Sequence, residues 1–172
     1  MGKQTNTYNF RQYLSLILLF SPPLLFLGLI IVYKNHPNLD LSELFPYLPW
    51  QFLLLGLFGI VATVGGVLDW MYHRNPLNLK IPAKEREAEA AALGLGGIPM
   101  FVLMWSATLS EHPYMYLIPI LIVLIYTVVM ICYDEFVFHI KRCGKRENWY
   151  HRMLVFGNGL AWLSWMHLIF NG

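Results

Sequence analysis

The chain has 172 residues, of which 57% are apolar and only 13% are charged, about half the charged share of a soluble domain. Twelve Lys and Arg against ten Asp and Glu leave a formal net charge of +2, which is too small to favour nucleic-acid binding. The two cysteines, Cys132 and Cys143, support neither a disulfide framework nor a Cys-rich zinc site. The composition instead indicates an integral membrane protein.

Five apolar stretches are long enough to cross a bilayer, which takes about 20 residues as a helix. Each must be helical, because lipid offers no partner for a free backbone N–H or C=O. The expected spans are residues 13–33, 50–72, 90–109, 114–139 and 149–170. With no internal repeat or domain boundary, residues 1–172 are expected to form a single all-α transmembrane domain. Its helices 2–5 should form an antiparallel four-helix bundle.

The positions of the basic residues predict the orientation of these spans. Eleven of the twelve Lys and Arg precede the first span, lie between the second and third, or surround the turn between the fourth and fifth. Only Lys34 lies on the other side. Because cytoplasmic loops carry the excess of basic residues, the N-terminus is predicted to be cytoplasmic. After five spans the C-terminus is then non-cytoplasmic.

Acidic residues and histidines recur four residues apart at the predicted cytoplasmic ends of spans two to five. Residues four apart share one face of an α-helix, so each pair presents two groups able to bind a metal. Four antiparallel helices would bring these groups to one depth. The candidate metal ligands are Asp69, His73, Glu85, Glu89, Glu135, His139, Glu147 and His151.

This ligand set favours a site for two transition-metal ions, with iron preferred over manganese or zinc. It resembles the ferritin-like di-iron proteins in ligand type and helical origin only, because their Glu-x-x-His spacing is absent. Asp134 and Asn158 are expected as second-layer hydrogen-bonding partners of the ligands, and Glu85 is also a candidate acid–base group. Small residues continue the ligand faces, among them Gly65, Ala92 and Gly96, and indicate either close helix packing or a chamber on the lipid side.

The predicted function is a membrane oxidoreductase of hydroxylase, oxidase or desaturase type. Its partners would be a membrane lipid or other lipid-soluble substrate and an electron donor. One alternative is a non-catalytic membrane subunit whose acids and histidines form salt bridges or dock a partner. Another is a two-metal hydrolase, in which metal-bound water attacks an ester or phosphate.

Overall fold

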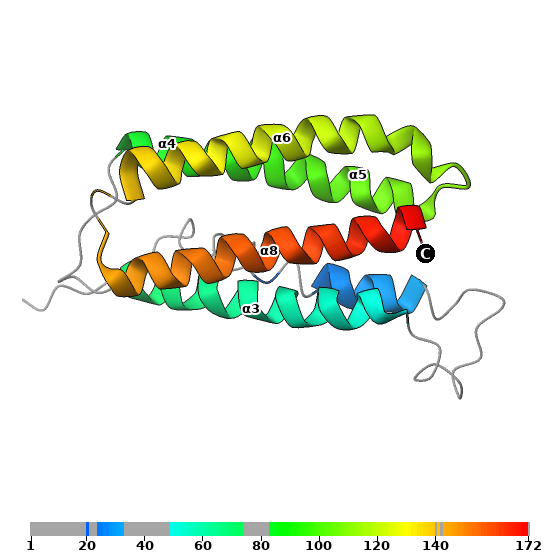
Figure 1. Ribbon diagram of the computed structural model, residues 1–172, viewed down its shortest axis with the longest axis horizontal. Coiled ribbons are helices and arrows are strands. Elements are labelled where there is room, and N and C mark those ends of the chain that lie inside the picture. Colours follow the sequence, from blue (N-terminus) through cyan, green and yellow to red (C-terminus); the bar gives the residue numbers. More distant parts are fainter. Residues whose placement is uncertain are drawn as a thin grey trace, which may run out of the picture.

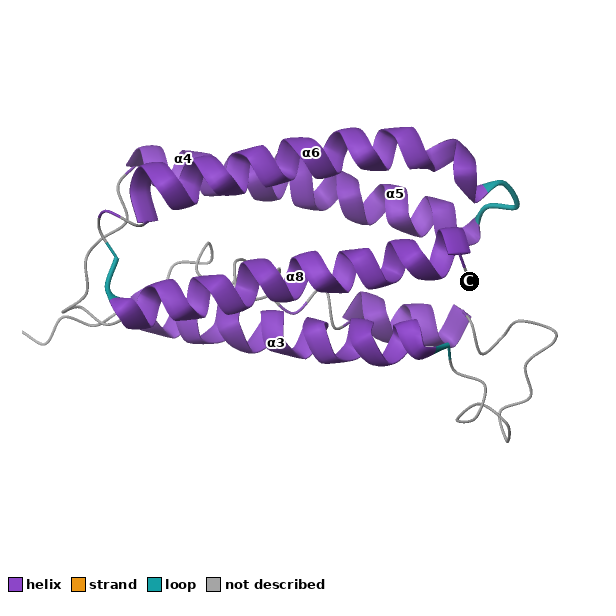
Figure 2. Ribbon diagram, in the orientation of Figure 1, coloured by secondary structure: helices purple, strands orange, loops and turns teal. Residues whose placement is uncertain are grey.

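The computed structural model describes residues 20, 24–32, 49–73, 83–139, 141 and 143–171. The side chains of Glu85, Glu89 and His139 lie outside this description, although the backbone around them is helical. Every regular element in the described part of the chain is a helix, and Figure 2 shows a short described loop between α5 and η3. The all-α prediction is therefore confirmed for these residues.

Helices α3 (Trp50–His73) and α8 (Lys145–Asn171) pack along each other and form one layer with the helical segment 24–32 (Figure 1). Glycines allow the two helices to approach closely. A methyl group on Gly65 of α3 would lie 2.7 Å from the backbone nitrogen of Leu154, and one on Gly157 of α8 would lie 2.7 Å from that of Ala62. Backbone contact of this kind, typical of small residues on membrane helices, fixes the register of α3 on α8.

The second layer begins with three consecutive helical segments that together form one long rod. They are α4 (Ala83–Ala91), the π-helical turns η2 (Ala92–Gly97) and α5 (Ile98–Leu109). Pro99 falls near the start of α5, where its missing N–H is tolerated best. A methyl group on Gly96 would collide with the side chain of Thr127, so η2 packs tightly on the neighbouring helix.

Helix α6 (Leu117–Asp134) completes the second layer. It follows the 3-10 turn η3 (Pro113–Tyr116) and ends in the π-helical turn η4 (Glu135–His139). In Figure 1 the end of α3 and the start of α8 lie at the same end of the molecule as the start of α4 and the end of α6. The residues expected at the cytoplasmic side therefore share one end.

Four of the described helical stretches are long and apolar enough to cross a membrane. They are Trp50–His73, Ala92–Leu109, Pro113–Phe138 and Lys145–Asn171, and they coincide with predicted spans two to five. Of the first predicted span, 13–33, the structure describes residues 20 and 24–32. The remainder of that span and the segments that flank it lie outside the described residues.

Hydrogen bonds join the two layers at the end opposite the acids and histidines. The indole Nε1 of Trp165 donates to the hydroxyl of Thr108 at 3.1 Å, and that hydroxyl donates to the Met104 carbonyl at 2.8 Å. The hydroxyl of Tyr114 donates to the carbonyl of Phe170 at 2.7 Å. These bonds hold α8 against α5 and η3.

Candidate functional site

At one end of the α3 and α8 pair, a histidine lies between two carboxylates. His73 Nε2 is 3.6 Å from Asp69 Oδ1 on the same helix and 3.3 Å from Glu147 Oε1 on α8. The side chain of Glu147 is only 3% exposed. The four-residue spacing thus places Asp69 and His73 on one face, as predicted, and that face meets the first turn of α8.

A second ion pair connects the two layers at the same end. His151 Nε2 of α8 lies 3.6 Å from Glu135 Oε2, at the start of η4. Asp134, the preceding residue, is buried at the end of α6. We refer to Asp69, His73, Glu147, Glu135 and His151 together as the ion-pair cluster.

The prediction of a two-metal oxidoreductase is wrong for this arrangement. Among the residues whose side chains the structure describes, no three His, Cys, Asp or Glu side chains are placed to hold a metal ion. Within these side chains, His73 Nε2 lies beside the carboxylates of Asp69 and Glu147, and His151 Nε2 lies beside that of Glu135. The roles predicted for Glu85, Glu89 and His139 fall on side chains outside the described part.

Two of the small residues that continue the predicted ligand faces, Gly65 and Gly96, are packing contacts. Gly65 lies against the backbone of α8, with the Tyr150 carbonyl 2.9 Å from a methyl group placed on it, and Gly96 lies against Thr127. Close helix packing, rather than a chamber, explains these two glycines. Free space is found elsewhere.

A partly open apolar cavity of about 340 Å³ lies where segment 24–32 meets α3 and α8, with Phe101 of α5 also in its wall. This volume is at the lower end of the range for small-molecule sites. Segment 24–32, α3, α5 and α8 all contribute to its wall. The lining residues are Leu25, Phe26, Leu27, Leu29, Leu55, Gly56, Gly59, Ile60, Thr63, Val64, Phe101, Asn158, Ala161, Trp162 and Trp165.

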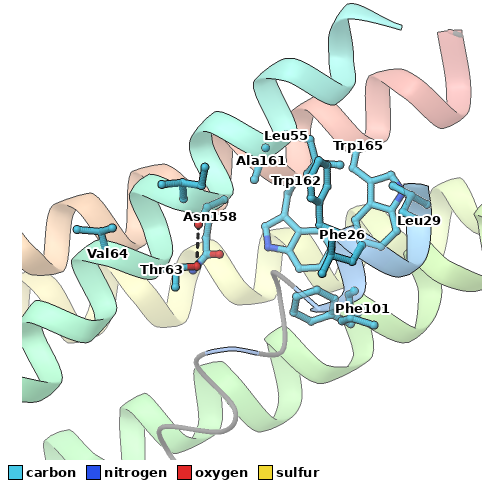
Figure 3. Close-up of a pocket in the computed structure, with 15 residues that line it drawn as sticks. Phe26, Leu29, Leu55, Thr63, Val64, Phe101, Asn158, Ala161, Trp162 and Trp165 are labelled. Carbon is cyan, nitrogen blue, oxygen red and sulfur yellow. Dashed lines mark hydrogen bonds between the residues drawn. The ribbon is translucent and has the colours of Figure 1, made fainter. Parts of the chain in front are cut away.

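Aromatic rings line one end of the cavity, as Figure 3 shows. Trp162 and Trp165 are stacked at 5.5 Å with an interplanar angle of 7°, and Phe101 meets Trp162 at 4.4 Å with an angle of 63°. Phe26 completes this end from segment 24–32. These rings offer flat apolar faces to anything that enters.

Polar side chains meet the cavity at its other end, where Thr63 and Asn158 lie together in Figure 3. The Thr63 hydroxyl donates to the Gly59 carbonyl at 2.8 Å, which leaves its oxygen able to accept a hydrogen bond. Asn158 makes no hydrogen bond to any described residue through its side chain. The structure thus places Asn158 in the cavity wall, while its predicted hydrogen bond to a metal ligand stays a prediction.

The cavity was not predicted, although part of its signal is present in the sequence. Asn158 lies between two glycines within an apolar helix and is a polar group that needs a partner. The Trp162 and Trp165 pair, taken from the sequence alone, is typical of helix packing or an interfacial belt and does not indicate a cavity. Comparison of the chain with protein-family models, characterised proteins and solved structures gives no match. The function must therefore be inferred from the cavity and its lining.

Proposed function

We propose that this chain is a multi-pass membrane protein that binds a lipid-soluble molecule in the cavity lined by segment 24–32, α3, α8 and Phe101. In the proposed topology α3, the α4 to α5 rod, α6 and α8 cross the bilayer as an antiparallel four-helix bundle. The N-terminus is cytoplasmic, as the basic residues suggest. The observation that carries the proposal is the aromatic-lined cavity with a polar group at one end.

The outer surface of the described helices supports the membrane part of this proposal. The most apolar 18-residue window of the stretch Pro113–Phe138 has a mean hydropathy of 2.7, yet only 6% of that window is buried. Side chains such as Ile118, Ile122 and Ile125 are more than 60% exposed. A continuous apolar surface of this kind needs a covering of lipid or protein.

The size and chemistry of the cavity support the binding part. Its lining is almost entirely apolar and therefore gives water few hydrogen-bonding partners. The cavity is partly open, with exposed side chains such as Leu27 and Ile60 in its wall. A lipid-soluble molecule matches this lining and would reach the site laterally, through the hydrocarbon layer.

Gly59 provides a direct test, because it lines the cavity and a methyl group placed on it meets nothing within 4 Å. Gly59→Leu should fill part of the cavity without disturbing the helices. Gly159 also has open space around it but does not line the cavity, so Gly159→Leu is the matched control.

The experiment is organic extraction of the purified full-length protein, followed by mass spectrometry. We expect about one lipophilic molecule per chain in the wild type and in Gly159→Leu, and a severalfold lower amount in Gly59→Leu. Equal amounts in all three proteins would contradict the proposal.

A further inference from the structure

The depth of Asn158 restricts what the cavity can bind. Asn158 is thirteen residues from either end of α8, which places it about 20 Å from each helix end. Thr63, its neighbour at the polar end of the cavity, is similarly central in α3. Under the proposed topology both side chains lie close to the middle of the bilayer.

A phospholipid cannot satisfy a polar group at this depth. Its ester and head groups lie at the boundary of a hydrocarbon core about 30 Å thick, hence about 15 Å from the midplane. A phospholipid could place only a hydrocarbon chain beside Asn158. The amide would then remain without a hydrogen bond in an apolar environment, which is costly.

We infer that the ligand is a neutral lipophile whose carbonyl or hydroxyl group is hydrogen-bonded by the Asn158 side chain near the bilayer midplane. The inference rests on the proposed function and specifies the ligand class of the same site. The amide offers both donors and an acceptor, and the Thr63 oxygen offers a second acceptor. Such a ligand would lie wholly within the hydrocarbon layer.

The rest of the cavity suits the apolar part of that ligand. Trp165 follows Asn158 by seven residues on α8, so the aromatic end lies about 10 Å farther along the helix. The lining between them is apolar, with Ala161 on α8 and Ile60 on α3. A chain or ring system extending from the hydrogen-bonded group would therefore contact Trp162, Trp165 and Phe101.

The test compares three probes on the purified full-length protein: a long-chain ketone, the hydrocarbon of the same length and a phosphatidylcholine. Each competes against a photoreactive hydrocarbon that labels the protein. The wild type should bind the ketone about tenfold more tightly than the hydrocarbon, the effect of one buried hydrogen bond to an otherwise unpaired amide.

Asn158→Leu should reduce this ratio to about one while leaving hydrocarbon affinity unchanged, which also shows that the cavity is intact. Ser164→Ala, which removes a buried hydroxyl of α8 outside the cavity, should keep the wild-type ratio. An unchanged ratio in Asn158→Leu, or competition by phosphatidylcholine equal to that of the ketone, would overturn the inference but not the proposed function. Failure of all three probes to compete would overturn both.

Discussion

His73 Nε2 on α3 lies 3.3 Å from Glu147 Oε1 on α8, at one end of the most extensive helix pairing among the described residues. The Glu147 side chain is almost completely buried, whereas His73 is also within 3.6 Å of Asp69. The buried Glu147 carboxylate therefore fills space between α3 and α8 in addition to contacting His73. Its removal should therefore change stability more than the removal of a surface carboxylate.

Glu147→Ala should destabilise the protein by about 2 kcal/mol, because it empties the buried position of the carboxylate and leaves the partly exposed His73 with one partner fewer. The measurement is thermal or denaturant unfolding in detergent. Glu87→Ala serves as the control, since Glu87 is exposed on α4. A loss of stability no greater than that of the control would show that the His73 and Glu147 contact contributes little.

The two glycines of α8 should respond in opposite directions to the same substitution. A methyl group on Gly157 would lie 2.7 Å from the Ala62 nitrogen and 2.9 Å from the Phe58 carbonyl, so Gly157→Ala should destabilise by about 1–3 kcal/mol. Gly159 has open space around it, so Gly159→Ala should be neutral or stabilising by up to about 1 kcal/mol. The measurement is the unfolding midpoint of each variant relative to the wild type. Equal shifts in the two variants would contradict the close packing of α3 on α8.

Trp165 and Thr108 should be energetically coupled across the layers. The hydrogen bond from Trp165 Nε1 to Thr108 Oγ1 at 3.1 Å joins α8 to α5. A double-mutant cycle with Trp165→Phe and Thr108→Val should give a coupling free energy of about 1 kcal/mol. Additive effects of the two substitutions would show that this bond does not hold the layers together.

The predicted orientation has a direct topological consequence. A reporter fused after Gly172 should report the non-cytoplasmic side, whereas one inserted in residues 75–82 should report the cytoplasm. The physical reason is the placement of eleven of the twelve basic residues on one side. The reverse pattern would invert the proposed topology while leaving the cavity argument unaffected.

Hydropathy predicted the spans well, because a helix in lipid must satisfy its backbone internally and its length is set by the bilayer. The second span was expected at 50–72 and the helix occupies Trp50–His73. The four-residue spacing also predicted correctly that Asp69 and His73 lie on the same face of their helix.

Helical phase did not predict which helices contact each other. His73 and Glu147 meet because α3 packs on α8, whereas Glu135 belongs to the other layer and meets His151 alone among the contacts described. The predicted convergence of all the pairs also involves Glu85, Glu89 and His139, whose side chains lie outside the described part of the chain. The cavity depends on four segments at once, so no single periodicity could reveal it, although Asn158 marked its polar end.

The central claim is that the cavity holds a lipid-soluble molecule, and site-mapped photolabelling tests it most directly. Full-length protein in lipid vesicles would be labelled with a long-chain ketone carrying a photoreactive diazirine, and the modified peptides identified by mass spectrometry. If the cavity binds the ketone, we expect labels at Trp162 and Trp165 and on the α3 peptide around Gly59. This labelling should fall about tenfold in Gly59→Leu and stay unchanged in Gly159→Leu. Labelling confined to the exposed face of α6, or equal in all three proteins, would contradict it.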